Sequence, residues 1–252
     1  LGASMGGMIA QHLAAMAPER VESLTLIMTS SGAEGLPAPS AALVQLFKSP
    51  DPDMPARLSQ ALLSLNGNAF NDPRVTVIHD DAFNGVDKLI AKGDKYDAII
   101  VDLPDPSHPD LNKLYSDYFY RKLKELMSSD GALTVQSTSP YHAQKAFISV
   151  AKTLALAGFD VKQYHHNVPS FGEWGWSIAT LNGKDAQHRL AQLTELPIVD
   201  DWLTLGLVKG AFEFPANFYQ DATNIKPNEL GSLQLYHYHQ QAWSETQGLD
   251  LF

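Results

Sequence analysis

The sequence predicts a Rossmann-like α/β fold, in which a doubly wound and mostly parallel sheet carries helices on both faces. Two observations support this prediction. The strand candidates are short, apolar throughout and separated by segments long enough for a helix, which is typical of a parallel sheet covered on both sides. The chain has 252 residues and is 44% hydrophobic, so it can bury a substantial core as one large or two small domains.

The first elements predicted are a turn, a helix and a strand. Small residues from Gly2 to Gly7 permit a tight turn, and an amphipathic pattern then predicts a helix over residues 8–16, which ends at the next proline. The apolar run at residues 23–28 predicts a strand. Residues 30–55 are rich in Ser, Pro, Gly and Ala, so we expect a linker or a junction there.

The rest of the chain alternates between helices and strands. The pattern predicts helices over about residues 58–65, 86–91, 115–127 and 141–157. Apolar runs between them predict strands at residues 74–78, 96–101, 132–136 and 160–165, and one more strand is expected beyond Trp176. Gly131 marks a turn before its strand, and Gly158 closes the preceding helix. We expect the strands at 74–78, 96–101 and 132–136 to be neighbours in one sheet.

Composition excludes several classes of function. The chain has no cysteine, so disulfides, thiolate metal sites and a cysteine nucleophile are excluded, and we predict no metal site. A formal net charge of −10 argues against a nucleic-acid partner and favours a cationic substrate. No run approaches the ~18 apolar residues of a membrane helix. Since no signal sequence is present either, we expect a cytoplasmic protein.

Two carboxylates follow the predicted strand at residues 96–101, in the sequence Asp102-Leu103-Pro104-Asp105-Pro106. In open α/β sheets ligands bind at the carboxyl edge of the strands. The two prolines prevent the loop from continuing as a helix that would carry the acids away. A purely structural alternative is an Asp-Pro turn followed by a helix N-cap. Spacing alone leaves both interpretations open.

A series of motifs in the larger part of the chain resembles a known enzyme family. The motifs are Leu65-Asn66-Gly67-Asn68, Asp72-Pro73-Arg74-Val75, Asp80-Asp81-Ala82-Phe83, the Asp102 to Pro106 element, Leu114-Tyr115, Phe119-Tyr120, Gly131 to Gln136, and Phe171 to Gly175. In this order they resemble the catalytic domain of polyamine aminopropyltransferases of the spermidine synthase type. The resemblance extends from about residue 51 to residue 252.

The resemblance implies a reaction and a set of site residues. The reaction is transfer of an aminopropyl group from decarboxylated S-adenosylmethionine, a co-substrate and not a cofactor, to putrescine or a related polyamine. Asp102 matches the general base, and Asp105 matches the carboxylate that orients the substrate amine. The other implied contacts are Tyr115, Gln136 and Trp174 toward the acceptor, and Asp81, Ala82 and Leu103 toward the donor. A homodimer is compatible with this family.

The first 48 residues resemble a different family. Gly2-Ala3-Ser4-Met5-Gly6 fits the Gly-x-Ser-x-Gly turn of an α/β-hydrolase nucleophile elbow, which makes Ser4 an alternative nucleophile. A catalytic triad also needs an acid and a histidine after the serine, and no Gly-His element follows at a suitable distance. The chain does not begin with Met. We therefore expect a chimera or fragment, with a hydrolase-like segment at residues 1–48 that could complete the sheet.

Residues 49–252 then form an aminopropyltransferase-like domain without its usual N-terminal part. Three functions stay open from the sequence, namely aminopropyl transfer, serine hydrolysis at Ser4, and an inactive truncated domain. The histidines at 237 and 239 would share a face in an extended segment, but a packed or solvated aromatic cluster is the simpler expectation for them.

Overall fold

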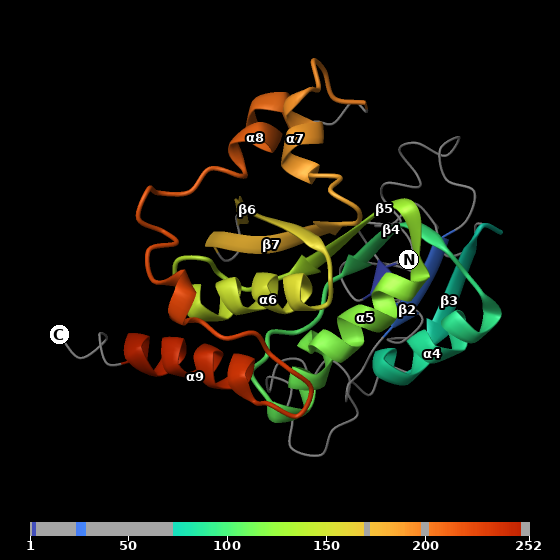
Figure 1. Ribbon diagram of the computed structural model, residues 1–252, viewed down its shortest axis with the longest axis horizontal. Helices are drawn as coiled ribbons and strands as arrows, with labels where there is room; N and C mark the ends of the chain where they lie inside the picture. Colours follow the sequence, from blue (N-terminus) through green and yellow to red (C-terminus); the bar gives the residue numbers. More distant parts are fainter. Residues whose placement is uncertain (1, 4–23, 29–72, 169–171, 198–201, 248–252) are drawn as a thin grey trace, which may run out of the picture.

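The computed structural model describes residues 2–3, 24–28, 73–168, 172–197 and 202–247, and every element below lies in these ranges. The described strands form a seven-stranded sheet with the order β3-β2-β1-β4-β5-β7-β6 (Figure 1). Their bounds are β1 Gly2–Ala3, β2 Leu24–Met28, β3 Val75–His79, β4 Tyr96–Val101, β5 Met127–Gln136, β6 Asp160–Val168 and β7 Gly172–Thr180.

Strand direction divides the sheet into two parts. The strands β3, β2, β1, β4 and β5 are parallel to their neighbours. Strand β7 runs antiparallel to both β5 and β6, so the β6–β7 hairpin forms one edge of the sheet. The sheet is therefore mixed and mostly parallel.

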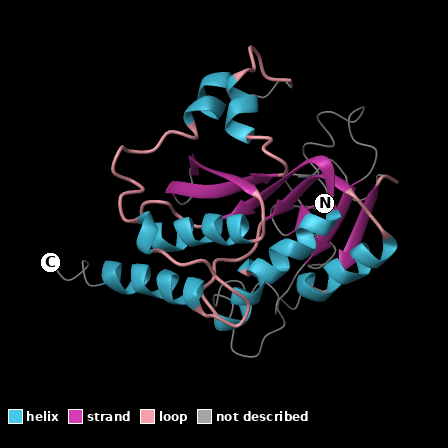
Figure 2. Cartoon of the chain, viewed as in Figure 1, coloured by secondary structure: helices cyan, strands magenta, loops and turns pink. Residues whose placement is uncertain are grey.

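Helices lie between and after the strands (Figure 2). The α-helices are α4 Ala82–Lys92, α5 Asp117–Leu126, α6 Gln144–Leu156, α7 Ala186–Ala191, α8 Leu205–Gly210 and α9 Gln234–Gln247, and two 3₁₀ helices are η3 Pro109–Tyr115 and η4 Ala222–Asn224. In Figure 1, α4, α5 and α6 follow one side of the sheet, and α7 and α8 project on the other side of the β6–β7 hairpin.

Successive side chains of β5 point to opposite faces of the sheet, and their neighbours show how each face is covered. Leu133 and Val135 are buried in one core cluster with Leu123 of α5 and Leu154 of α6. The residue between them, Thr134, lines a cavity together with residues of α7 and α8. Because successive side chains of a strand point to opposite faces, helices in the described part of the chain cover both faces, as predicted.

Local chemistry defines the ends of the helices next to the site. Asp81 caps α4, since its side chain accepts from the backbone N–H of Asn84, and the helix ends at Gly93 with φ 76°. Ser116 caps α5 by accepting from Phe119 N–H. The predicted helix over 115–127 is thus shorter than expected, because Ser116 ends η3 and starts α5.

Gly131 does not form the predicted turn. It lies inside β5, close to a register shift between Tyr96 and Ala98 of β4. A Cβ atom on Gly131 would lie 3.0 Å from the carbonyl oxygen of Tyr96. A strand glycine is typical of a position where two backbones approach closely, so the residue permits a longer strand instead of ending one.

The strand predictions are confirmed in position except for the one expected beyond Trp176, which begins earlier, at Gly172, and contains that residue. One expected pairing is also wrong. Strand β3 does not pair with β4, because β2 and β1 lie between them. Both intervening strands come from the segment that resembles a hydrolase. The predicted helices at residues 8–16 and 58–65 and the linker at 30–55 lie outside the described residues.

Candidate active site

The acidic residues predicted for the site lie at one edge of the sheet. Strand β3 ends at His79, two residues before Asp81, and β4 ends at Val101, directly before Asp102. The strands from β3 to β4 are all parallel, so their carboxyl ends share an edge. This placement is the one that open α/β sheets use for ligands, and for Asp102 it agrees with the prediction from its position after the strand at residues 96–101.

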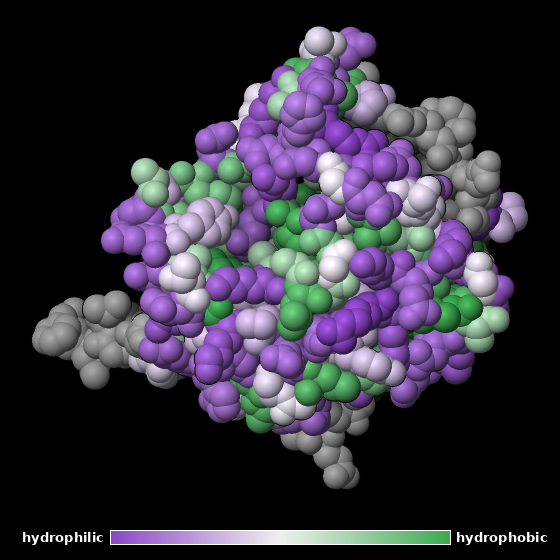
Figure 3. Space-filling model, viewed as in Figure 1, coloured by the Kyte–Doolittle hydropathy of each residue, from purple (hydrophilic) through white to green (hydrophobic). Residues whose placement is uncertain are grey.

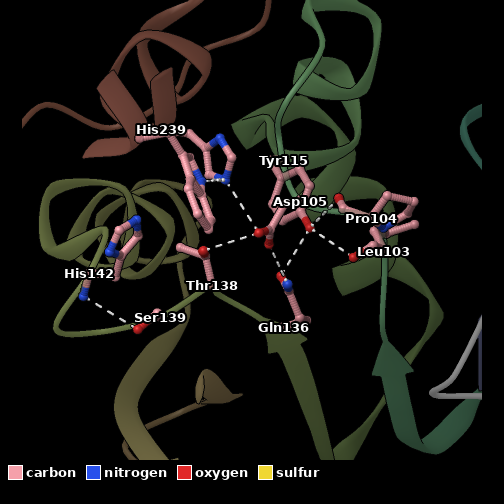
Figure 4. A network of polar contacts seen from close by, with 10 residues as sticks. Leu103, Pro104, Asp105, Tyr115, Gln136, Thr138, Ser139, His142 and His239 are labelled. Carbon is pink, nitrogen blue, oxygen red and sulfur yellow. Dashed lines mark hydrogen bonds and ion pairs between the residues drawn. The ribbon is translucent and has the colours of Figure 1, made fainter. Parts of the chain in front are cut away.

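The carboxylate of Asp105 is the centre of a polar network (Figure 4). Its Oδ1 accepts a 2.6 Å hydrogen bond from Gln136 Nε2. Its Oδ2 accepts from Thr138 Oγ1 at 3.4 Å and lies 3.2 Å from His239 Nε2. The side chain is 19% exposed, so it can still meet a ligand. The end of β5, the loop directly after it and the distant helix α9 therefore supply one carboxylate with three partners.

Tyr115 also belongs to this network. Its hydroxyl lies 3.0 Å from the carbonyl oxygen of Pro104, 3.1 Å from Gln136 Oε1 and 3.3 Å from the carbonyl oxygen of Leu103. Burial raises the pKa of this hydroxyl well above its usual range, and the charge of Asp105 adds to the effect. The hydroxyl therefore keeps its proton and donates to oxygen. This contact orients the amide of Gln136, with its oxygen toward Tyr115 and its nitrogen toward Asp105.

Thr138 has an unusual backbone conformation. Its φ is +63°, which is rare for a β-branched residue and costs free energy. The residue is buried, and its carbonyl oxygen accepts a 2.9 Å hydrogen bond from Gly175 N–H. Gly175 in turn has no room for a side chain, because an added Cβ would lie 2.4 Å from the ring of Phe147. Packing around Gly175 thus holds the hydroxyl of Thr138 toward Asp105.

Asp102 lies beside an apolar cavity of about 380 Å³ between the sheet and the α7–α8 segment. The residue is only 8% exposed. The other lining residues include Ile100, Thr134, Tyr164, Trp176, Leu207 and Phe212. Figure 3 shows apolar side chains gathered in the middle of the molecule, below the α7–α8 projection. A carboxylate at the wall of such a cavity can bind a cationic group whose remaining atoms are hydrocarbon.

The residues predicted for the donor side also have structural roles. Asp81 Oδ1 accepts from Asn84 N–H at 3.1 Å, and its Oδ2 lies 3.7 Å from Lys113 Nζ. Ala82 starts α4 and is buried, and Leu103 is buried in the same core cluster. The N-cap function of Asp81 uses one carboxylate oxygen and leaves the other at the sheet edge. Its contact with a nucleobase stays a prediction.

Trp174 and Ser4 are not brought into this network. Trp174 pairs with His166 in the β6–β7 hairpin, and it is not among the residues that line the cavity beside Asp102. Trp176, two residues further on the same strand face, lines that cavity instead. Ser4 lies outside the described residues. Within the ranges that the structure describes, no three His, Asp or Glu side chains are grouped to hold a metal ion.

Three residues of the site were not predicted from the sequence. Thr138 and His239 both contact Asp105, and Trp243 donates from Nε1 to His239 Nε2 at 2.9 Å. His237 and His239 belong to a helix and not to an extended segment, so they point in different directions, with His237 exposed and His239 buried. The only signal was the presence of histidine and tryptophan four residues apart, at a spacing that places both on one helix face.

The fold and the site define a class of protein. The strand order with an antiparallel β7 is that of a Rossmann-like, methyltransferase-type α/β protein, and its ligand edge here carries paired acidic residues. Comparison with family profiles assigns residues 51–191 to the spermine/spermidine synthase domain, more than half of the chain. The chain belongs to the spermine/spermidine synthase family. Residues 1–74 match the alpha/beta hydrolase fold, which overlaps the first match.

Curated relatives agree with this family. The chain is 97% identical over 212 residues to the polyamine aminopropyltransferase of Shewanella oneidensis, covering 84% of this chain and 37% of that protein. It is 34% identical over 237 residues to polyamine aminopropyltransferase 2 of Ralstonia nicotianae, covering 89% of this chain and 44% of the relative. The chain thus spans less than half the length of these relatives.

Solved structures confirm the fold. The spermidine synthase of Thermotoga maritima matches with a TM-score of 0.57 at 15% identity, over 87% of this chain and 66% of that one. A spermidine synthase in complex with the transition state analogue AdoDATO matches with a TM-score of 0.56 at the same identity.

None of the helices in the described part of the chain is long and apolar enough to cross a membrane.

Proposed function

We propose that this chain carries the catalytic centre for aminopropyl transfer from decarboxylated S-adenosylmethionine to putrescine or a related polyamine, with spermidine and methylthioadenosine as products. The observation that carries the proposal is the partly exposed Asp105 carboxylate in its network, three residues from the buried Asp102 at the ligand edge of the sheet. The chain's negative charge and the paired acids suit a diammonium acceptor.

The proposed reaction is a displacement at the carbon next to a sulfonium. A neutral amine nitrogen forms a bond to that carbon, the carbon–sulfur bond breaks, and the electron pair returns to sulfur as methylthioadenosine leaves. The amine must lose a proton, and a carboxylate within reach can accept it. We assign this role to Asp102. The co-substrate supplies the leaving group, so the displacement needs no separate cofactor.

The second amine of the acceptor stays an ammonium at neutral pH. We assign its binding to Asp105, because a charge-assisted hydrogen bond to a carboxylate is short and strong. Gln136, Thr138 and Tyr115 hold that carboxylate in place. On the donor side we assign the adenine amino group to Asp81, with Ala82 and Leu103 beside the nucleoside. A homodimer and a cytoplasmic location remain predictions.

The proposal is tested by the release of methylthioadenosine when decarboxylated S-adenosylmethionine and putrescine are added. We expect Asp102→Asn to lower this release by about 10²- to 10⁴-fold, which is the usual contribution of a positioned general base. Asparagine keeps the size and shape of the side chain but cannot take up the proton. A matched control is Asp97→Asn, an exposed residue near the other end of the same strand.

Two outcomes would contradict the proposal. The first is an Asp102→Asn chain that transfers as fast as the parent while Asp97→Asn also has no effect. The second is labelling of Ser4 by a fluorophosphonate probe together with no methylthioadenosine release, which would make hydrolysis the better interpretation.

A further inference from the structure

The cavity beside Asp102 extends along the sheet away from the proposed donor side. Its sheet wall is formed by residues of β4, β5, β7 and β6, among them Ile100, Thr134, Trp176 and Tyr164. In the strand order β3-β2-β1-β4-β5-β7-β6, Asp102 follows β4, whereas Asp81 follows β3. Asp102 therefore lies between Asp81 and the cavity.

The opposite wall comes from α7, α8 and the residues after α8, and hydrogen bonds hold it in place. The backbone N–H of His165 in β6 donates to the carbonyl oxygen of Ala211 at 2.9 Å. Lys209 Nζ of α8 donates to the carbonyl oxygen of Leu193, after α7, at 2.8 Å. The cavity thus has anchored walls, and its volume of about 380 Å³ is within the usual range for small-molecule sites.

The chemistry of these walls suits hydrocarbon and not a second charge. Among the described residues that line the cavity, Asp102 is the only acid, and Asp105 does not belong to the lining. The rings of Tyr164 and Trp176 stack with their centroids 5.5 Å apart, and the Tyr164 hydroxyl lies 2.9 Å from Thr134 Oγ1, its hydrogen-bond partner. Burying an ammonium group without an anionic partner is costly, whereas burying a methylene group is favourable.

We propose that this cavity binds the apolar tail of a primary monoamine, and that the chain transfers the aminopropyl group to such amines in addition to diamines. The inference rests on the function proposed above. The neutral amine nitrogen forms a bond to the carbon next to the sulfonium, and the carbon–sulfur bond breaks with its electron pair returning to sulfur. Asp102 takes the amine proton. The products are an N-alkyl-1,3-diaminopropane and methylthioadenosine.

The geometry of the displacement favours this placement of the tail. The nitrogen must approach the carbon from the side opposite to the departing sulfur. With the nucleoside assigned to Asp81, the sulfur departs toward β3, so the nitrogen arrives from the side of β5, where the cavity lies. At ~30 Å³ for a group of the size of water, the cavity has room for about twelve such groups. Hexylamine, with seven non-hydrogen atoms, is therefore small enough to enter.

The test measures methylthioadenosine release from decarboxylated S-adenosylmethionine with propylamine, butylamine, pentylamine or hexylamine, and with putrescine as the reference acceptor. We expect kcat/KM to rise by up to about 4-fold with each added methylene, which is the fold-change that corresponds to burial of one methylene. Mass spectrometry of the N-alkyl-1,3-diaminopropane separates transfer from hydrolysis of the donor.

Variants of the cavity wall show where the tail binds. Ala211→Leu should flatten the alkylamine series, because the larger side chain occupies part of the cavity. The matched control Ala191→Leu makes the same change on an exposed residue of α7 outside the lining, and it should behave like the parent. Leu207→Ala removes apolar contact from the same wall and should also lower the gain per methylene; Leu207 is 41% exposed, so this variant should fold.

Asp105→Asn separates the two kinds of acceptor. It should raise the ratio of hexylamine to putrescine transfer by about 10- to 100-fold, because only the diamine needs this carboxylate. Transfer to putrescine with no transfer to any alkylamine, or with an alkylamine series that is flat in the parent, would overturn the inference and leave the proposed function in place. A series that stays equally steep in Ala211→Leu and Leu207→Ala would also overturn it. Absence of methylthioadenosine release with every acceptor would instead refute the proposed function, and the inference with it.

Discussion

Tyr115→Phe should destabilise the protein and weaken acceptor binding at the same time. The substitution removes one hydroxyl and leaves the buried ring in place. That hydroxyl has one proton, which it shares between the oxygens of Pro104 and Gln136, at 3.0 and 3.1 Å. A lost hydrogen bond that leaves buried acceptors without a partner costs about 1–3 kcal/mol. For a chain of this size that corresponds to a fall in melting temperature of about 2–12 °C.

The effect on the site follows from the orientation of Gln136. Without the hydroxyl, Gln136 Oε1 loses its donor, and of these two contacts only the one from Nε2 to Asp105 Oδ1 still holds the amide in place. We therefore expect the KM for putrescine to rise, and methylthioadenosine binding to stay within error of the parent. Thermal unfolding and steady-state release of methylthioadenosine measure the two effects.

Tyr120→Phe provides the matched control. Tyr120 is also fully buried, and its hydroxyl has no hydrogen-bond partner among the described residues. Removing a buried hydroxyl without a partner should be neutral or stabilising. The two Tyr→Phe changes should thus differ in the sign of their effect on the melting temperature. Equal effects on stability, or an unchanged KM in Tyr115→Phe, would refute this account of the network.

Three further predictions follow from the structure. Asp105→Asn should raise the KM for putrescine by about 10- to 100-fold. Asp81→Asn should weaken the binding of methylthioadenosine and leave the melting temperature unchanged, because asparagine caps a helix as well as aspartate. Calorimetric titration with each ligand separates the effects of the two variants. Gly175→Ala should cost about 1–3 kcal/mol of unfolding free energy through the contact with Phe147, and Phe147→Leu should restore part of that loss in urea titrations. Burial raises the pKa of Tyr164 to about 12. In the unfolded chain this pKa is ~10. The free energy of unfolding is therefore unaffected by this group below pH ~10, and it falls by at most about 1.4 kcal/mol per pH unit as pH rises toward 12. Urea titrations should show a smaller fall in Tyr164→Phe.

Short sequence patterns were enough to predict where the acidic residues of the site lie along the chain. The run of apolar residues at 96–101 and the proline-rich acidic loop after it are adjacent in sequence, so their order alone places Asp102 and Asp105 at the carboxyl end of a strand. The same holds for Asp81 after β3. The motif series was specific enough to indicate the family, which the comparison of residues 51–191 confirms.

Only the tertiary structure decided which strands are neighbours and what surrounds Asp105. Strands β1 and β2 separate β3 from β4, because pairing depends on contacts between residues far apart in the chain. His239 is 134 residues from Asp105, and it is carried by α9, a helix that packs against α6. Thr138 is β-branched, so its sequence favours an extended conformation; its φ of +63° exists because the surrounding backbone and Gly175 hold it. Short-range patterns determine where strands, helices and charged loops begin, whereas contacts between distant segments determine which side chains meet.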